Sequence, residues 1–104
     1  MTPDPNRIVN VAVQVLPLTE DAIPFVDHAI AAIQQAAAAH NLRVEVGPLE
    51  TTIEGPFEAA FDAAKAAHLA TIEAGVQHVV TLIKLADGVQ GGMTIDEKTS
   101  KYRV

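Results

Sequence analysis

One short segment of the sequence brings together side chains that could bind a small molecule. Thr51 and Thr52 carry hydroxyl groups, Glu54 carries a carboxylate, and Gly55 follows directly. A carboxylate beside hydroxyls on a half-buried strand can accept hydrogen bonds from an amine or counter a cation. The glycine has no side chain and leaves space next to the carboxylate. A solvated acid at the end of a β-branched strand explains the same residues, so both interpretations stay open.

Two further side chains could contribute to a site. His68 lies within an apolar helical stripe, where it is either a core histidine with one hydrogen bond or a residue that lines a cleft between helix and sheet. Lys84 follows mainly apolar residues, which is typical of an exposed or snorkelling lysine, and it could also pair with Glu54. We expect no metal site, because there is no cysteine and Thr71 and Ile72 occupy the third and fourth positions after His68.

The composition of the chain excludes several functional classes. A net charge of −6 repels a nucleic-acid backbone, and the absence of cysteine excludes disulfides and thiolate catalysis. The sequence contains no nucleophile elbow and no phosphate-binding loop. It also has no signal-peptide pattern and no apolar run of about 18 residues, so we expect a cytoplasmic protein without a membrane partner or a cofactor.

Hydrophobic periodicity predicts six elements that would position these side chains. Alternation of apolar residues indicates strands over 8–16, 42–46, 49–55 and 78–85, and spacings of three and four indicate helices over about 20–40 and 57–74. Residues 1–7 are expected to form a loose arm, and 8–104 a single domain. The polar tail from Thr94 could form a short helix, with Asp96 and Glu97 in its first turn.

The order strand, helix, strand, strand, helix, strand predicts a ferredoxin-like α+β plait. In this fold a four-stranded antiparallel sheet carries both helices on one face. We expect Thr19, Glu20 and Asp21 to supply the cap of the first helix. Asn41 and Gly75 are expected to end the two helices. The helical faces expected to be apolar consist of Ile23, Val26, Ile30, Ile33 and Ala37 in the first helix and of Phe57, Phe61, Ala64, His68 and Ile72 in the second.

The predicted sheet leaves one face without a helix. Alternation places apolar side chains on that face, namely Ile8, Ala12, Leu16, Val80 and Leu82. Exposed apolar patches of this kind mark interfaces. We therefore expect self-association, to a homodimer or to a homotetramer built as a dimer of dimers.

Several stretches together resemble the thiamine-binding protein family, the YkoF-like group of small ferredoxin-like proteins. The resemblance covers roughly residues 8 to 98 and is carried by Val15-Leu16-Pro17-Leu18, by Val46-Gly47-Pro48-Leu49-Glu50-Thr51-Thr52-Ile53-Glu54-Gly55, by His68, and by Gly75-Val76-Gln77-His78-Val79-Val80-Thr81-Leu82-Ile83-Lys84-Leu85. The positions that match the motif of the family are Thr51, Thr52, Glu54, His68 and Lys84. Leu49-Glu50, Leu69 and Asp87 depart from the family pattern, and Glu50 adds bulk and charge where a glycine is common.

The resemblance implies a non-enzymatic protein that binds thiamine or its hydroxymethylpyrimidine part. Among the matched residues, we expect Glu54 to contribute most to binding, because it would lie on the helix-free face beside Thr52. Two alternatives remain open at this point. One is a small dimeric enzyme that uses the open sheet face, with His68 or Glu54 as the base, and the other is a structural or regulatory oligomer without a ligand.

Overall fold

A central strand with a partner on each side organises the fold. The computed structural model describes residues 2–103; Met1 and Val104, which the predicted arm and domain include, lie outside the described residues. The elements are β1 (Ile8–Pro17), α1 (Ile23–His40), β2 (Arg43–Val46), β3 (Thr51–Pro56), α2 (Phe57–Glu73), β4 (Val79–Ala86), α3 (Ile95–Thr99) and a 3₁₀ turn (Ser100–Tyr102). The strands form one antiparallel sheet in the order β2-β3-β1-β4, which confirms the predicted ferredoxin-like plait.

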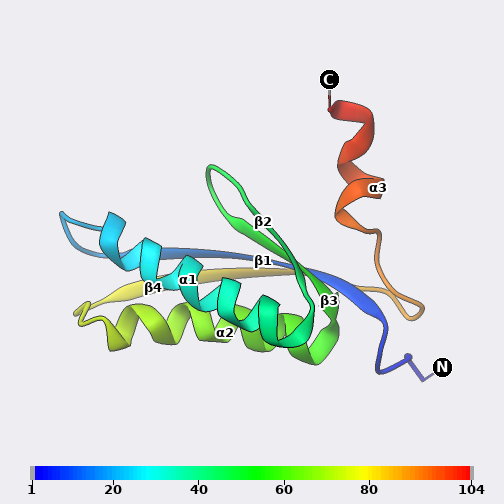
Figure 1. Cartoon of the computed structure of the whole chain (residues 1–104), viewed down its shortest axis with the longest axis horizontal. Coiled ribbons are helices and arrows are strands. Elements are labelled where there is room, and N and C mark those ends of the chain that lie inside the picture. The colour runs from blue at the N-terminus through cyan, green and yellow to red at the C-terminus, as the bar shows by residue number, and fades with distance from the viewer. Residues whose placement is uncertain (1, 104) are drawn as a thin grey trace.

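Both long helices cover the same face of the sheet, as predicted (Figure 1). Strand alternation explains why: Val9, Val11 and Val13 of β1 are buried beneath the helices. Their cross-strand neighbours have the same orientation, since Val11 lies opposite Ile53 of β3 and Leu85 of β4. The core therefore lies between β1, β3 and the two helices.

The buried stripe of α2 differs from the predicted one. Its fully buried residues are Ala60, Ala63, Ala64, Ala67 and Thr71. Of the predicted apolar face only Ala64 is buried, whereas Ile72 is exposed and His68 is half-buried. The physical reason is that alanine side chains allow close approach to the sheet and to α1, and the larger side chains are then placed at the margins of the contact.

Helix α1 also departs from the prediction at its beginning. Its N-cap is Ala22, with no side-chain cap, and Pro24 lies in the first turn, so the expected cap from residues 19–21 is wrong. Proline fits there because the first turn has no intrahelical acceptor for its missing N–H. At the other end, Asn41 adopts the expected left-handed conformation, with φ of 53°. Gly75, which follows the C-cap of α2, also has a positive φ, of 102°.

The chain that precedes β1 is anchored by Arg7. Its guanidinium group donates to both carboxylate oxygens of Asp87, at 2.7 and 2.6 Å, and lies 4.9 Å from the centre of the Phe57 ring. The hydrogen bond from Arg7 lowers the pKa of Asp87 below its ordinary value. Arg7 thus joins the beginning of β1 to the end of β4 and to α2.

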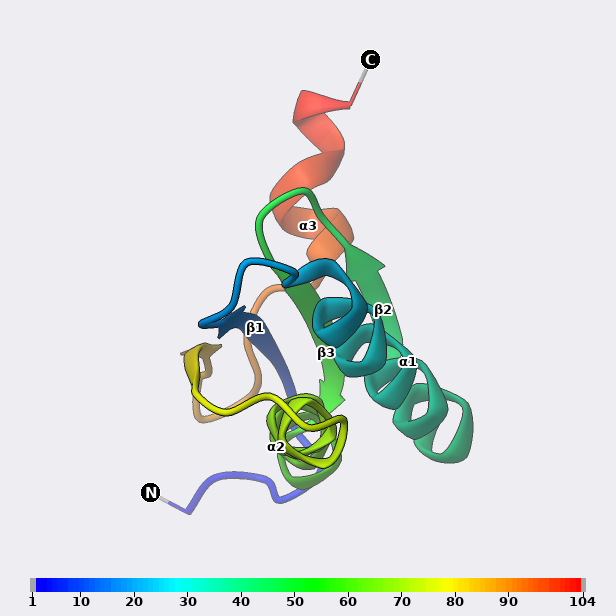
Figure 2. The same cartoon turned by 90° about the vertical axis from the view of Figure 1, so that its left-hand side faces the viewer.

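The tail after β4 forms the short helix that its sequence suggested. Thr94 caps α3 by accepting from the Glu97 amide at 3.1 Å, and Glu97 Oε1 accepts from the Thr94 amide in return. This reciprocal pair is a capping box. Figures 1 and 2 show α3 beyond the sheet, on the side opposite α1 and α2. The helix-free face is therefore partly covered by the tail, which the sequence did not predict.

The tight packing of α2 gives a first test. We expect Ala64→Leu to lower the free energy of unfolding by about 1–3 kcal/mol, because Ala64 is fully buried and a larger side chain overpacks the core. Urea denaturation measures this change. The same substitution at the exposed Ala38 of α1 is the control, and equal stability of the two variants would contradict the described packing.

Candidate functional site

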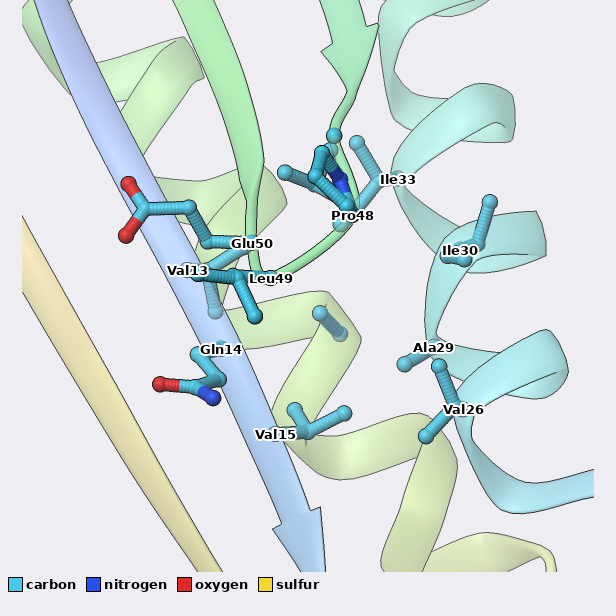
Figure 3. Close-up of a pocket in the computed structure, with 13 residues that line it drawn as sticks. Val13, Gln14, Val15, Val26, Ala29, Ile30, Ile33, Pro48, Leu49 and Glu50 are labelled. Atoms are coloured by element: carbon cyan, nitrogen blue, oxygen red, sulfur yellow. The ribbon is translucent and has the colours of Figure 1, made fainter. Parts of the chain in front are cut away.

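A cavity of about 100 Å³ lies between α1 and the turn that joins β2 to β3. We call it the turn cavity. Its walls are mostly apolar and comprise Val13 and Val15 of β1, Val26, Ala29, Ile30 and Ile33 of α1, Pro48 and Leu49 of the turn, and Ala67 of α2 (Figure 3). Concave apolar sites with a few polar groups are typical binding sites for small molecules.

The cavity exists because β3 leaves β1 early. Strand β1 pairs with β3 only as far as the Val13–Thr51 pair, whereas its pairing with β4 continues to the Pro17–Val79 pair. Beyond Val13 the side of β1 that faces away from β4 is therefore not covered by β3. The turn and α1 surround this uncovered side without filling it.

Three polar residues line the turn cavity: Gln14, Glu50 and Thr51. In Figure 3 the carboxyl group of Glu50 and the amide group of Gln14 lie on the side of the cavity away from α1. Thr51 is buried and belongs to the helix-covered face of β3, because it lies opposite the buried Val13 of β1. An amide, a carboxylate and a hydroxyl can together accept from and donate to a polar heterocycle.

A second cavity, of about 310 Å³, lies on the helix-free face and is bounded on one side by the C-terminal segment. We call it the open-face cavity. Ala12 of β1 lies at its base, with Thr52 of β3 and Lys84 of β4 as its two cross-strand neighbours. Lys98 and Ile95 contribute from α3. Two of the predicted site residues, Thr52 and Lys84, thus share this cavity.

Glu50 lines both cavities and is the site residue that sequence reasoning missed as a ligand group. Its Oε1 lies 2.8 Å from Lys84 Nζ, so Lys84 is an exposed lysine that pairs with Glu50, and the possible pair with Glu54 does not form. The alternation of side chains along the predicted strand could have identified Glu50. Glu50, Thr52 and Glu54 alternate, so Glu50 belongs to the same face as Lys84.

Glu54 has a partner in the C-terminal segment. Its Oε1 accepts a hydrogen bond of 2.6 Å from the backbone amide of Ile95, the first residue of α3. The adjacent Asn10 side chain donates to the Met93 carbonyl, also at 2.6 Å. Both contacts bind the tail to the sheet, and the buried Ile95 side chain supports them.

Charged side chains complete the attachment of the tail. Arg43 of β2 donates to both oxygens of Asp96, and Arg103 bridges Asp96 and Glu45. The hydrogen bond from Arg43 is the main reason that the pKa of Asp96 is held below its ordinary value, and Arg103 adds to this effect. The tail is therefore held by ionised groups at neutral pH.

His68 lies apart from both cavities and lines a third one, of about 380 Å³, between α2 and β4, in agreement with the predicted possibility of a cleft between helix and sheet. Its Nδ1 is 2.6 Å from Thr81 Oγ1, a contact between α2 and the helix-facing side of β4. The five predicted site residues therefore do not form one cluster: Thr51 lines the turn cavity, Thr52 and Lys84 line the open-face cavity, Glu54 binds the tail, and His68 contacts Thr81.

Residues 2–103 contain neither a cluster that could hold a metal ion nor a membrane-spanning helix. Within this part of the chain, no three histidine or acidic side chains are grouped so that they could hold a metal ion. No helix among these same residues combines the length and the apolar character needed to cross a membrane.

Comparison with known proteins gives a consistent result. Residues 11–103 match the family model described as thiamine-binding protein. A UPF0045 protein of Clostridium perfringens is 38% identical over 96 residues, which are 90% of this chain and 96% of the relative.

Solved structures agree with this match. A DUF77 domain of unknown function from Bacillus cereus has a TM-score of 0.83 and 39% identity, over 94% of this chain and 92% of that chain. A candidate thiamine biosynthesis/salvage protein of Thermotoga maritima has a TM-score of 0.70 and 32% identity, over 92% of this chain and 99% of that one.

The contact of Glu54 with α3 can be tested directly. We expect Glu54→Ala to raise the hydrogen-exchange rate of the Ile95 amide roughly tenfold, because that amide loses an ionised acceptor. Exchange measured by NMR reports this amide separately from the rest of the tail. Glu20→Ala, in the exposed loop before α1, is the control. An unchanged rate at Ile95 in the Glu54 variant would show that the carboxylate does not hold the helix.

Proposed function

Because the chain belongs to the thiamine-binding protein family, we propose that it binds thiamine or its hydroxymethylpyrimidine part, with the pyrimidine ring in the turn cavity. The observation that carries this proposal is the apolar cavity with Gln14, Glu50 and Thr51 at its polar side. An aminopyrimidine is flat and apolar on its faces and polar at its edge. The cavity has the same distribution of apolar walls and polar groups.

The size of the cavity supports one ring. A dry apolar cavity of about 150 Å³ is known to hold benzene, so the turn cavity, at about 100 Å³, has to widen by side-chain movement before it admits a six-membered ring. Leu49, which is exposed on the turn, can make such a movement. The second ring of thiamine then has to lie outside the turn cavity.

The open-face cavity offers space for that second ring. Glu50 lines both cavities, so its carboxylate can reach a group that extends from one to the other. The thiazolium ring of thiamine is a cation, and a half-buried carboxylate is a suitable counter-ion. The net charge of −6 also favours the approach of a cation.

We further propose that the protein binds its ligand without transforming it. His68 and Glu54, the two bases considered from the sequence, contact Thr81 and the Ile95 amide and do not line the turn cavity. Mass spectrometry of thiamine after incubation with the protein should recover it unchanged.

Self-association is the second part of the proposal. In the described sheet, β4 has a strand on one side only, and it exposes Val80 and Leu82, each nearly half accessible. Long edge strands with exposed apolar side chains pair readily with another strand. On the open face, Leu16 lies opposite Val80 and is exposed as well. An edge contact and a face contact together would build a dimer of dimers.

Thr51 provides the test of the site. We expect Thr51→Val to weaken hydroxymethylpyrimidine binding by about two- to tenfold, because it removes a hydroxyl while keeping the volume of the side chain. Thr52→Val is the matched control, since the neighbouring residue points to the opposite face of β3. Titration calorimetry of both variants measures the effect. Equal affinities for the wild type and the Thr51 variant would remove this cavity as the pyrimidine site.

Light scattering tests the assembly. At micromolar concentration we expect a mass about four times the 11.0 kDa of the chain. Leu82→Asp should reduce it, because a charge is costly in an apolar contact. Val89→Asp, in an equally exposed loop position, should leave it unchanged. A wild-type protein with a mass of only 11.0 kDa would overturn self-association.

A further inference from the structure

We propose that Lys84 sets the charge preference of the binding site, because it competes with a cationic ligand for the carboxylate of Glu50. This inference rests on the proposed function and assigns a role to one residue within it. In the free protein Lys84 Nζ lies 2.8 Å from Glu50 Oε1. A ligand that brings its own positive charge to Glu50 has to displace this ammonium group.

The two partners differ in how firmly they are placed. The side chain of Lys84 is 74% exposed, whereas that of Glu50 is 32% exposed. Glu50 lines both cavities, and Lys84 lines only the open-face cavity. The carboxylate is thus the more enclosed partner at the junction, and the ammonium group approaches it from the solvent side.

The sheet register explains how Lys84 reaches Glu50. Lys84 lies on β4, and its direct neighbour on β1 is Ala12. A methyl side chain at position 12 leaves room for the lysine to extend across β1 towards the β2–β3 turn. A large side chain at position 12 would occupy that path, so the pair depends on the small residue between the strands.

The exposure of Lys84 makes the displacement possible. Exposed ion pairs contribute little to stability, since both partners are well solvated when they separate. A displaced lysine ammonium is rehydrated at once, because it is a compact and strongly hydrated charge on a flexible stem. The competition therefore lowers the affinity for a cation modestly and leaves a neutral ligand unaffected.

The experiment compares thiamine, a cation, with hydroxymethylpyrimidine, which is neutral. Titration calorimetry is carried out on the wild type, Lys84→Gln and Lys98→Gln. Lys98→Gln is the matched control, because Lys98 lines the same cavity from α3, whereas the ion pair of Glu50 is with Lys84. Thermal unfolding shows that each variant is folded.

We expect Lys84→Gln to tighten thiamine binding by about two- to fivefold and Lys98→Gln to change it by less. Hydroxymethylpyrimidine should bind equally to all three proteins. The gain should shrink at high salt, which screens charges at an exposed site. In a Glu50→Gln background, Lys84→Gln should not increase the affinity for thiamine, because the carboxylate for which the lysine competes is absent.

The possible failures can be told apart. Equal thiamine affinities for the wild type and Lys84→Gln, or equal gains in both lysine variants, would overturn the role of Lys84 while leaving the binding function intact. A gain that persists in the Glu50→Gln background would also overturn it. If neither compound binds the wild type, the proposed function fails and this inference fails with it.

Discussion

The unequal pairing of β1 is the constraint on which the rest of the structure depends. This strand is the centre of the sheet, yet β3 accompanies it only to Val13 while β4 continues to Pro17. The turn from β2 to β3 therefore lies next to a part of β1 that β3 does not cover, and α1 borders the same part of β1. Apolar side chains of β1 and α1 surround the space, because both elements present their core-facing residues to it. The turn cavity is thus a consequence of strand length, and two of the polar residues beside it, Glu50 and Thr51, lie where the turn meets β3.

Strand alternation then divides a short motif between two environments. Thr51 and Thr52 are adjacent in sequence, but one faces the helices and the other faces the C-terminal segment. A segment of this kind cannot form a single cluster of ligands on a flat strand, since successive side chains point in opposite directions. Glu50 lies on the same face as Thr52, but it precedes the first residue of β3 and belongs to the turn, so it lines the turn cavity as well. Its carboxylate can therefore lie between the two cavities, where the strand residues that follow it cannot.

The fold could be predicted from the sequence because its signals are local. Alternation of valine in β1, the glycine and proline residues at the turns, and the left-handed Asn41 each act within a few residues. Apart from the cap of α1, the errors concern information that is not local. Alanines give no indication of which helix face will be buried, so the stripe of α2 was misplaced towards Phe57 and Ile72. The C-terminal segment covers the open face through contacts with Asn10, Arg43 and Glu54, which lie some 40 to 80 positions earlier in the sequence. Contacts between residues so far apart cannot be predicted from the local pattern of a single sequence.

The carboxylates of the open face show which one is available to a ligand. Glu45 is held by Arg103, whose planar guanidinium group also binds Asp96, and Glu54 is held by a backbone amide of α3. The Ile95 amide is part of the backbone, so releasing Glu54 would require movement of α3, whereas Glu45 is held by a half-exposed arginine side chain. Glu50 is different, because its partner is a flexible and well-exposed lysine that makes a single point contact. Of these three acids, Glu50 has the most exposed partner, and it is also the one that lines the turn cavity.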